Sequence, residues 1–490
     1  MYLCKQKRIM EKLIGRDAER RELYRCFESS KSEFVVLYGR RRIGKTFLVN
    51  QVFRGQFSFY FTGSHKAPKQ RQLELFAKAL RVYAHLDYLP LVDNWYHAFD
   101  ALEQLIEAMP KAQKKVLFFD ELPWIDTPNS EFVSALEDFW NTWAALRDDI
   151  CFIACGSATS WIVDHLIENQ GGLHNRITSR IYLRPFYLYE CEQFVRMHGG
   201  TWDRYTLTQC YMYIGGVPYY WSLLDFGHDL PSNIDMLFFG THAKLSGEFS
   251  ELFQVLFRDA KVYIDIVRLL AEHREGMTRS ELAACISNGG SLTARLENLQ
   301  RCDFIMGYTP ANNKKKGTIF RLVDFFTLFY FKFIEHARSQ NREYWILKSS
   351  EPAVKSWQGL TFELICMAHS AQIIQRLGIA GILTKTYSWR SKQSDRQGKG
   401  AQIDLVIERT DHYIYLCEMK FSEEEYVITK DVEEVLRNKI SVFRSETKTK
   451  KTLLLTMVTT YGVKQNIHSC VMQREVTMDD LFFPLLKIGR

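Results

Sequence analysis

Short apolar runs alternate with amphipathic segments over about the first 160 residues of this chain. Each run is continuously apolar, which is typical of a strand buried on both faces of a parallel sheet. The amphipathic segments between the runs have the spacing of helices that cover such a sheet. The pattern predicts an α/β fold whose parallel sheet has strands at 34–38, 57–62, 116–119 and 151–155.

The pattern changes after this region. Residues 187–250 have helical spacing, interrupted by the Gly-Gly-Val-Pro stretch at 215–218. Three helix-like segments and a short strand at 317–323 follow, an order that suits a winged helix, and a second α/β segment fills the C-terminal part. The expected domains are a parallel-sheet core at 1–186, a helical lid at 187–250, a winged helix at 251–340 and a C-terminal α/β domain at 350–490.

Composition narrows the protein class only a little. The net charge of +7 allows a polyanionic partner such as DNA or RNA but does not require one. The 11 cysteines contain no Cys-x-x-Cys pair, which favours buried thiols in a cytoplasmic protein over disulfides or a zinc site. The most apolar run, 325–334, is about half the length needed to cross a bilayer and contains Lys332, so we expect no membrane partner.

A complete Walker A pattern follows the first predicted strand. Glycines let such a loop wrap closely, so that backbone N–H groups and the helix N-terminus face the phosphates of a nucleotide. The lysine would reach the β- and γ-phosphates, and the threonine hydroxyl would bind magnesium. The three arginines inside the loop either add positive potential for the nucleotide or point outward to partner carboxylates or nucleic acid. The expected ATP-binding residues are Gly39, Arg40, Arg41, Arg42, Ile43, Gly44, Lys45, Thr46 and Phe47.

Two later strands end in polar residues that suit the same site. The strand at 115–119 leads into Asp120 and Glu121, and we expect it to lie beside the strand that carries the loop. Asp120 would join the magnesium shell, and Glu121 would orient or deprotonate the attacking water. Ser157, after the strand at 151–155, would hydrogen-bond the γ-phosphate or the water, unless it is part of a plain turn.

These motifs, together with Ile-Gly-Arg-Asp-Ala-Glu at 14–19, Leu-Arg-Pro-Phe at 183–186 and Gly-Gly-Val-Pro-Tyr at 215–219, resemble the bacterial and archaeal AAA-like ATPases close to the STAND group. The resemblance implies ATP and Mg²⁺ as cofactors and allows a homo-oligomer. It places Arg16 near the adenine, and Pro218 in lid helices that pack against the nucleotide. Arg176 would be a sensor or finger for the γ-phosphate, although a surface arginine in a basic loop remains an alternative.

The second helix of the predicted winged helix carries few cations. Only Arg295 and Arg301 are basic there, and Glu297 opposes them. A helix that reads DNA usually offers more cationic and amide side chains. DNA contact and a packing or regulatory role both remain open for this module.

Two charges interrupt a strand that otherwise reads as buried, at 413–421. Glu418 and Lys420 share a face with apolar neighbours, and a buried charge without a partner is costly. Asp404 on the preceding strand supplies one partner, and a divalent metal would supply the strongest.

The predicted helix-strand-strand-strand-helix-strand order, with Asp404 and Glu418-x-Lys420 on its strands, resembles the PD-(D/E)xK nuclease core. The resemblance implies that both acids hold magnesium while Lys420 activates water or steadies the leaving charge. Glu363, in the first turn of a helix expected at 360–377, would complete the metal site.

The residues together predict a magnesium-dependent ATPase. Its nucleotide state would be relayed through the lid and winged helix to a nuclease-like domain that binds or cleaves nucleic acid. One alternative is a non-catalytic nucleotide switch that exposes a surface for a protein partner and carries an inactive nuclease-like domain. Another is a DNA-processing enzyme whose nuclease is primary and whose ATPase only licenses it.

Overall fold

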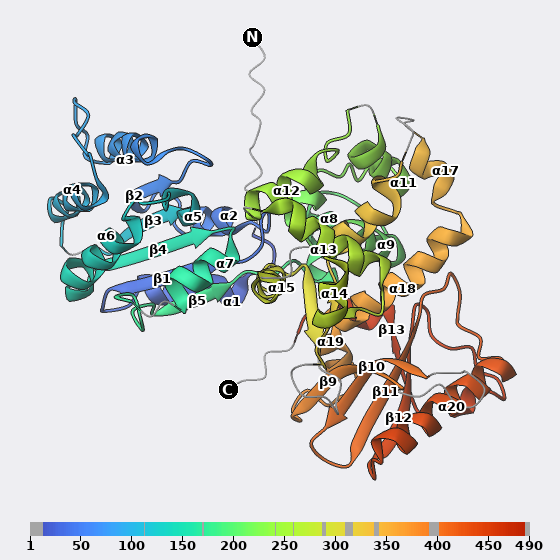
Figure 1. The fold of residues 1–490 in the computed structure, drawn as a ribbon. Coiled ribbons are helices and arrows are strands. Elements are labelled where there is room, and N and C mark those ends of the chain that lie inside the picture. The colour runs from blue at the N-terminus through green and yellow to red at the C-terminus, as the bar shows by residue number, and fades with distance from the viewer. Residues whose placement is uncertain are drawn as a thin grey trace. The chain divides into compact units, whose positions relative to one another are not determined.

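The computed structural model describes most of the chain (Figure 1). Its contacts form two compact units, residues 1–185 with 255–258 and residues 186–254 with 259–490, which are treated separately below. Within the described part, no helix combines the length and the apolar character needed to cross a membrane. The described residues are 13–111, 113–168, 171–240, 242–257, 259–286, 291–308, 317–337, 343–391 and 401–485.

The first unit is built on a five-stranded parallel sheet with the order β2-β3-β4-β1-β5. The four predicted strands are present, and β5 is an addition. The expectation that the Asp120 strand lies beside the loop strand is wrong, because β4 lies between β1 and β3. The strands are β1 Glu33–Tyr38, β2 Phe57–Thr62, β3 Lys115–Asp120, β4 Ile150–Gly156 and β5 Ser179–Tyr182.

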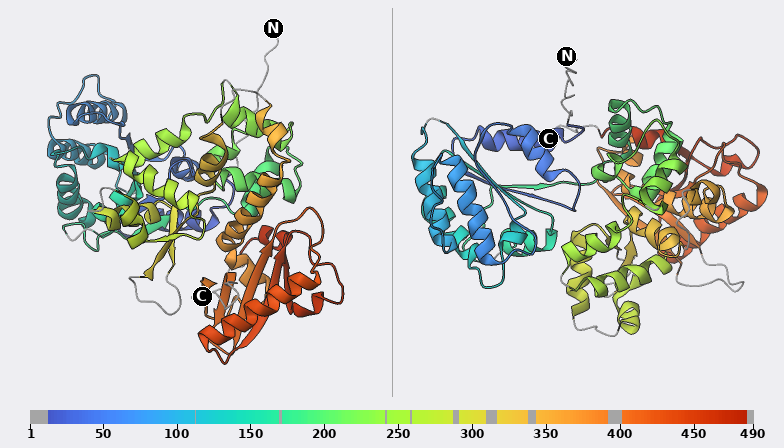
Figure 2. Two further views of the ribbon diagram at one scale, coloured as in Figure 1. Left: turned by 45° about the vertical axis from the view of Figure 1, so that its right-hand side comes forward. Right: turned by 90° about the horizontal axis from the view of Figure 1, so that it is seen from above.

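Helices cover both faces of this sheet, as Figure 2 shows. Successive residues of β1 enter different cores: Phe34 and Val36 pack on one face, and Val35 and Leu37 on the other. This two-sided burial explains why β1 is apolar at every position from Phe34 to Leu37. One face is covered by α3 Lys69–Tyr83, α4 Trp95–Glu107 and α6 Phe132–Asp138, and the other by α1 Asp17–Phe27 and α2 Lys45–Val52.

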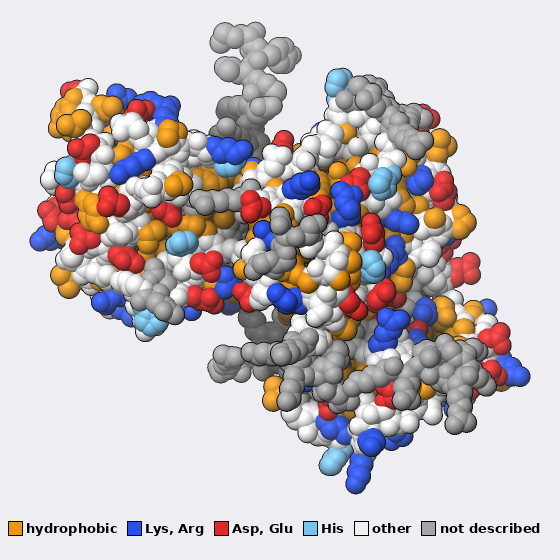
Figure 3. Space-filling view, in the orientation of Figure 1, with side chains coloured by type: hydrophobic (Ala, Val, Ile, Leu, Met, Phe, Trp, Pro, Cys, Tyr) orange, Lys and Arg blue, Asp and Glu red, His pale blue; other side chains and the backbone are white. Residues whose placement is uncertain are grey.

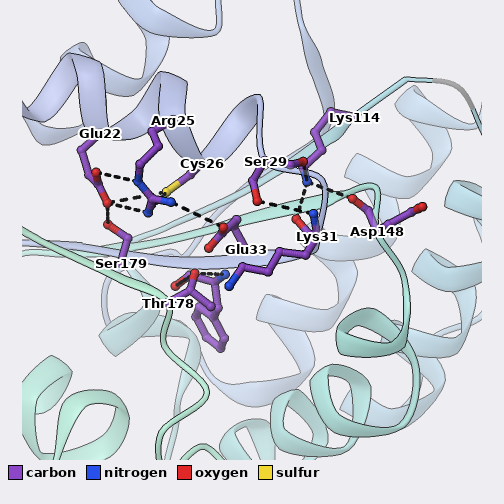
Figure 4. Close-up of polar contacts among 11 residues, drawn as sticks. Glu22, Arg25, Cys26, Ser29, Lys31, Glu33, Lys114, Asp148, Thr178 and Ser179 are labelled. Atoms are coloured by element: carbon purple, nitrogen blue, oxygen red, sulfur yellow. Dashed lines mark hydrogen bonds and ion pairs between the residues drawn. The ribbon is translucent and has the colours of Figure 1, made fainter.

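Polar contacts attach α1 to the amino-terminal end of the sheet (Figure 4). Ser179 Oγ donates a hydrogen bond of 2.6 Å to Glu22 of α1, and Arg25 donates one of 2.7 Å to the same carboxylate. Arg25 also lies 3.7 Å from Glu33, a buried acid at the start of β1. These contacts lie at the opposite end of β1 from the Walker A loop, which begins after Tyr38.

The second unit begins with short helices, as predicted for 187–250. The break at 215–218 is present: Gly215 has a φ of 62°, and Pro218 opens a new helix. A Cβ at Gly216 would lie 2.0 Å from the carbonyl oxygen of Phe186, so only glycine fits there. The α-helices are α8 Leu188–Met197, α9 Arg204–Ile214, α10 Pro218–Trp221, α11 Leu230–Ile234 and α12 Glu248–Leu256.

A small antiparallel sheet with the order β6-β8-β7 follows. Its strands are interleaved with three helices in the order helix, strand, helix, helix, strand, strand, and the predicted strand near 317–323 is β8. The elements are α13 Ala260–Glu272, β6 Met277–Thr278, α14 Arg279–Cys285, α15 Leu292–Arg301, β7 Ile305–Tyr308 and β8 Ile319–Leu322. The helices α16 Phe325–Phe329 and α17 Tyr344–Lys348 come next.

The C-terminal part holds a mixed sheet with the order β13-β12-β11-β10-β9. Strands β9, β10 and β11 are antiparallel, and β11, β12 and β13 are parallel. The helix expected at 360–377 is instead two helices, and the first begins at Pro352, so Glu363 is not in a first turn. The elements are α18 Pro352–Ala368, α19 Ser370–Arg376, β9 Thr384–Arg390, β10 Gln402–Arg409, β11 Tyr413–Lys420, α20 Lys430–Thr447, β12 Thr452–Thr459 and β13 Arg474–Thr477.

Candidate functional site

The Walker A loop turns tightly between β1 and α2. Gly39, Arg42 and Gly44 have φ angles of 139°, 70° and 87°, all in the left-handed range that favours glycine. A Cβ at Gly39 would lie 2.4 Å from the carbonyl oxygen of Leu183, which follows β5. The buried Lys45 Nζ donates 2.9 Å hydrogen bonds to the carbonyl oxygens of Gly39 and Arg40. The lysine ammonium therefore lies within the curve of the loop.

The three loop arginines are less exposed than they would be if all of them pointed outward to partner carboxylates or nucleic acid. Arg40 is buried, and Arg41 and Arg42 are half-buried, so the Arg40 side chain does not point outward. Ile43 packs into the core beneath the loop, and Phe47 is 37% exposed.

Thr46 and Asp120 meet at the carboxyl-terminal edge of the sheet. Thr46 Oγ1 donates a 2.7 Å hydrogen bond to Asp120 Oδ2, and Asp120 Oδ1 accepts one of 3.0 Å from the Glu121 N–H. Hydroxyl and carboxylate oxygens are the ligands that magnesium prefers. The residues present therefore fit the ion that the motif implies.

Glu121 is held by Ser157, a contact that the sequence did not suggest. Ser157 donates to Glu121 Oε2 through its hydroxyl at 2.9 Å and through its backbone N–H at 3.1 Å. Burial raises the pKa of Glu121, and the charge of Asp120 adds to this rise while Lys45 opposes it. A carboxylate with a raised pKa and a fixed orientation is suited to accept a proton. The pairing of β3 with β4, which brings these two strand ends together, could not be read from the motifs.

Three further residues, whose roles are predicted from the family resemblance, lie outside the loop and the strand ends. Arg16 is buried, and its guanidinium donates a 2.7 Å hydrogen bond to the carbonyl oxygen of Arg184, so two of the quoted motifs meet. Arg176 is exposed. Pro218 belongs to the other compact unit. The nucleotide roles of Arg16, Arg176 and Pro218 stay predictions.

In the C-terminal domain, Glu418 is paired with two lysines. Lys420 Nζ lies 2.9 Å from Oε1, and Lys439 Nζ of α20 lies 2.6 Å from Oε2. Burial alone would raise the pKa of Glu418, but the two ammonium groups lower it below its usual value. The sequence predicts that Asp404 supplies one partner for this pair of charges, and its charge acts on Lys420, whose pKa Glu418 and Asp404 raise against the effect of burial. The Glu418 carboxylate itself is balanced by Lys420 and Lys439. Sequence reasoning missed Lys439, which lies 21 residues from Glu418.

Asp404 and Glu363 lie close to this pair. Asp404 is on β10, next to the Leu405–Cys417 strand pair, and its Oδ2 accepts a 3.2 Å hydrogen bond from the Met419 N–H. Burial, reinforced by the Glu418 charge, raises the pKa of Asp404 to about 6. Burial, reinforced by Asp404, raises the pKa of Glu363 to about 7. Electrostatic interactions therefore connect the four residues predicted for this site, which are Glu363, Asp404, Glu418 and Lys420.

The three carboxylates do not form a ready metal site. Among the described residues, no group of three or more His, Cys, Asp and Glu side chains is arranged to hold a metal ion. Both oxygens of Glu418 are engaged by lysines, and Glu363 lies 3.8 Å from Arg321. In this arrangement the role of Glu363, Asp404 and Glu418 as metal ligands therefore stays a prediction.

On the face in view in Figure 3, surface charge gives no guide to a partner. Figure 3 shows basic and acidic side chains interspersed over the face in view. The net charge of +7 is therefore not gathered into one patch on that face.

Comparison with known proteins supports the ATPase assignment. Residues 13–224 match the model of a family described as "ATPase domain predominantly from Archaea". An uncharacterized protein of Methanocaldococcus jannaschii is 25% identical over 334 residues, which cover 66% of this chain and 68% of the relative.

Two solved structures are also similar to this chain. The Walker-type ATPase PABY2304 of Pyrococcus abyssi has 18% identity and a TM-score of 0.48, and the match covers 66% of this chain and 97% of that one. A signal transduction ATPase with numerous domains from Pyrococcus horikoshii, which has a tetratricopeptide repeat sensor, has 18% identity and a TM-score of 0.31. That match covers 75% of this chain and 50% of the other. The family match covers residues 13–224, less than half of the chain, and this is the region that carries the predicted ATPase motifs.

Proposed function

We propose that this chain hydrolyses ATP in a magnesium-dependent reaction at the loop of residues 39–46. The observation that carries the proposal is the contact of Thr46 with Asp120 beside the Glu121–Ser157 pair. Thr46 and Asp120 would hold the magnesium ion, which when bound neutralises phosphate charge. Lys45 would bind phosphate oxygens, and Glu121, held by Ser157, would take a proton from the attacking water.

The test is phosphate release from ATP by the purified full-length protein. Lys45→Ala should abolish release, because it removes the cation at the centre of the loop. Lys78→Ala, at an exposed lysine of α3 in the same domain, is the matched control and should leave the rate unchanged. Equal release by the wild type and Lys45→Ala would contradict the proposal.

We further propose that residues 251–340 contain a winged helix with a packing or regulatory role. The interleaved order of α13 to β8 supports the fold. Arg295 is half-buried and lies 3.8 Å from Asp259, so one of the two cations of the second helix is already paired. This pairing favours a relay between the lid at 187–250 and the domain at 350–490 over DNA reading.

We also propose that residues 350–490 form a nuclease-like domain that binds nucleic acid. Its support is the order of α18, β9, β10, β11, α20 and β12, with Asp404 and Glu418 on paired strands. Whether this domain cleaves its ligand is tested by adding manganese and labelled DNA or RNA. Asp404→Ala should remove cleavage, whereas Asp411→Ala, at the turn of the same hairpin, should not. Equal cleavage by both variants would exclude a catalytic role for Asp404.

A further inference from the structure

A cleft of about 660 Å³ lies between the small antiparallel sheet and strand β9, within the second unit. Its walls are formed by residues before and within β6, by α14, by one residue of β7 and two of β8, and by the end of β9 with the start of β10. The volume is in the range of roughly 300–1,000 Å³ that ligand pockets occupy. No step of the proposed ATPase reaction uses it.

Arginines gather along this cleft. Arg321 and Arg390 both line it, and both act on the hydroxyl of Tyr308, another lining residue. Burial raises the pKa of the Tyr308 hydroxyl, and the charges of these two guanidinium groups oppose the rise. Arg274, a half-buried cation whose charge acts on Arg321, does not line the cleft.

Acidic residues balance these two arginines only in part. Arg321 has its ion pair with Glu363 at 3.8 Å. The lining also holds two carboxylates, Glu275 and Glu281, and Glu281 accepts hydrogen bonds from the N–H and hydroxyl of Thr278. The guanidinium group of Arg390, which is exposed, makes no hydrogen bond or ion pair with any described residue. Arg390 is therefore the lining cation that is open to an anionic ligand.

The same walls offer the groups that bind a nucleotide. A guanidinium matches a phosphate with two parallel hydrogen bonds. The Tyr308 hydroxyl donates a 3.0 Å hydrogen bond to the carbonyl oxygen of Glu275, which fixes the ring for stacking on a base. A cleft of this volume has room for nucleotides of a single strand.

The cleft also adjoins the acidic residues of the nuclease-like domain. Ser388 on its wall donates a 2.8 Å hydrogen bond to the carbonyl oxygen of Asp404, and Gln402 lies two residues before that aspartate. Arg321 lines the cleft and contacts Glu363. A phosphate in the cleft would therefore compete with Glu363 for the same guanidinium.

We propose that this cleft binds the sugar-phosphate backbone of a single nucleic-acid strand, with Arg321 and Arg390 on the phosphates and Tyr308 against a base. Binding draws Arg321 away from Glu363 and releases that carboxylate beside Asp404. The inference rests on the proposed nucleic-acid function of the C-terminal domain. It adds that the ligand is a single strand and that the strand binds in this cleft.

The experiment measures the binding of a fluorescein-labelled single-stranded oligonucleotide, as DNA and as RNA, to the full-length protein by anisotropy. EDTA is present and ATP is absent, so neither cleavage nor ATP hydrolysis enters the result. Arg321→Gln and Arg390→Gln should each weaken binding about tenfold. For the double variant, the slope of log affinity against log salt should shrink by about 1.4, since each phosphate contact on a single strand contributes about 0.7.

Arg437→Gln, at an exposed arginine of α20, is the matched control and should bind like the wild type. Because Arg390 is exposed, its variant tests the cleft even if Arg321→Gln is poorly folded. A wild type that does not bind the strand, or an equal loss in the control, would overturn the inference. So would calorimetry showing that inorganic phosphate binds as tightly as the strand, since the site would then be one for free phosphate.

A failure of the ATPase or nuclease proposal can be distinguished from a failure of the cleft inference. Phosphate release from ATP should be the same in Arg390→Gln and the wild type, so a failed ATPase proposal leaves the binding result intact. Cleft-dependent binding without manganese-dependent cleavage would support the inference and exclude nuclease turnover.

Discussion

At the scale of single residues, the ATPase site depends on two close approaches of the chain. Gly39 passes so near Leu183 that a methyl group has no room. Glu121 receives two hydrogen bonds from Ser157, so its carboxylate has a defined direction. A substitution at each of these two contacts should therefore change a different property of the site.

Gly39→Ala should abolish nucleotide binding and lower stability. The added Cβ would lie 2.4 Å from one carbonyl oxygen, so the loop has to move away from Leu183. Gly55→Ala is the control: its φ of 74° is also left-handed, but no atom lies within 4 Å of its Cβ. The control should lose only about 1 kcal/mol from backbone strain. Thermal unfolding with and without ATP measures both effects, and equal behaviour of the two variants would contradict the steric explanation.

Glu121→Gln should separate nucleotide binding from hydrolysis. The amide can still accept from Ser157 but cannot take a proton, so the rate should fall at least about 100-fold while binding persists. Phosphate release and titration with a fluorescent ATP analogue measure the two properties. Glu131→Gln, at an exposed acid of the same domain, serves as the reference. A Glu121→Gln rate close to that of the wild type would remove Glu121 from the reaction.

The residues that could be predicted from the sequence are those whose role lies in a local motif. Lys45, Thr46 and Asp120 belong to patterns that fix both residue type and neighbouring element, and the structure brings them together. Lys439 and Arg321 could not be found in this way. Their partners, Glu418 and Glu363, are reached only through the packing of separate elements.

At the scale of elements, the hydrophobic pattern predicted the strands correctly where both faces of the strand are buried. The four continuously apolar strands are within one or two residues of their predicted bounds. Strand β5 was missed because its residues alternate between buried and exposed positions over only four residues. Helix α18 was started too late because its first turns, from Pro352, carry polar residues between Val354 and Trp357.

Helix α4 should make stability depend on pH through Glu103. Burial, together with Asp100 and Glu107 on the same helix and Asp138 on α6, raises the pKa of Glu103 to about 7. A carboxyl whose pKa is higher in the folded state costs nothing below about pH 4.5, where it is protonated in both states. The cost appears as pH rises and is complete above about pH 7.

Glu103→Gln should therefore stabilise the protein at pH 8, by about 1 kcal/mol after allowance for solvent screening, and have no effect at pH 4. Urea unfolding at the two pH values measures this difference. Glu28→Gln, at an exposed position outside the acidic cluster, should show no such dependence on pH. A stabilisation by Glu103→Gln that is equal at both pH values would contradict the electrostatic cause.

At the scale of the whole molecule, the ATPase loop and the arginine-lined cleft belong to different compact units. If nucleotide state is relayed between them, ATP should change the affinity of the protein for a single strand by fivefold or more, within the range of about 1–3 kcal/mol usual for coupled sites. Lys45→Ala should abolish the change, and Asp404→Ala should retain it. Anisotropy with and without ATP measures this, and a wild type indifferent to ATP would contradict the relay.

The strand order of the first unit has a consequence for how the protein is made. Strand β1, which leads into the phosphate-binding loop, pairs with β4 and β5, and both come later in the chain. A ribosome adds about 5–20 residues per second, so β1 waits on the order of ten seconds before β4 emerges. During that interval its apolar side chains have no sheet neighbour and are open to chaperones. Nascent chains that end before Ser179, where β5 begins, should be unable to hold nucleotide, because Leu183, the residue against which Gly39 closes, has not yet been made.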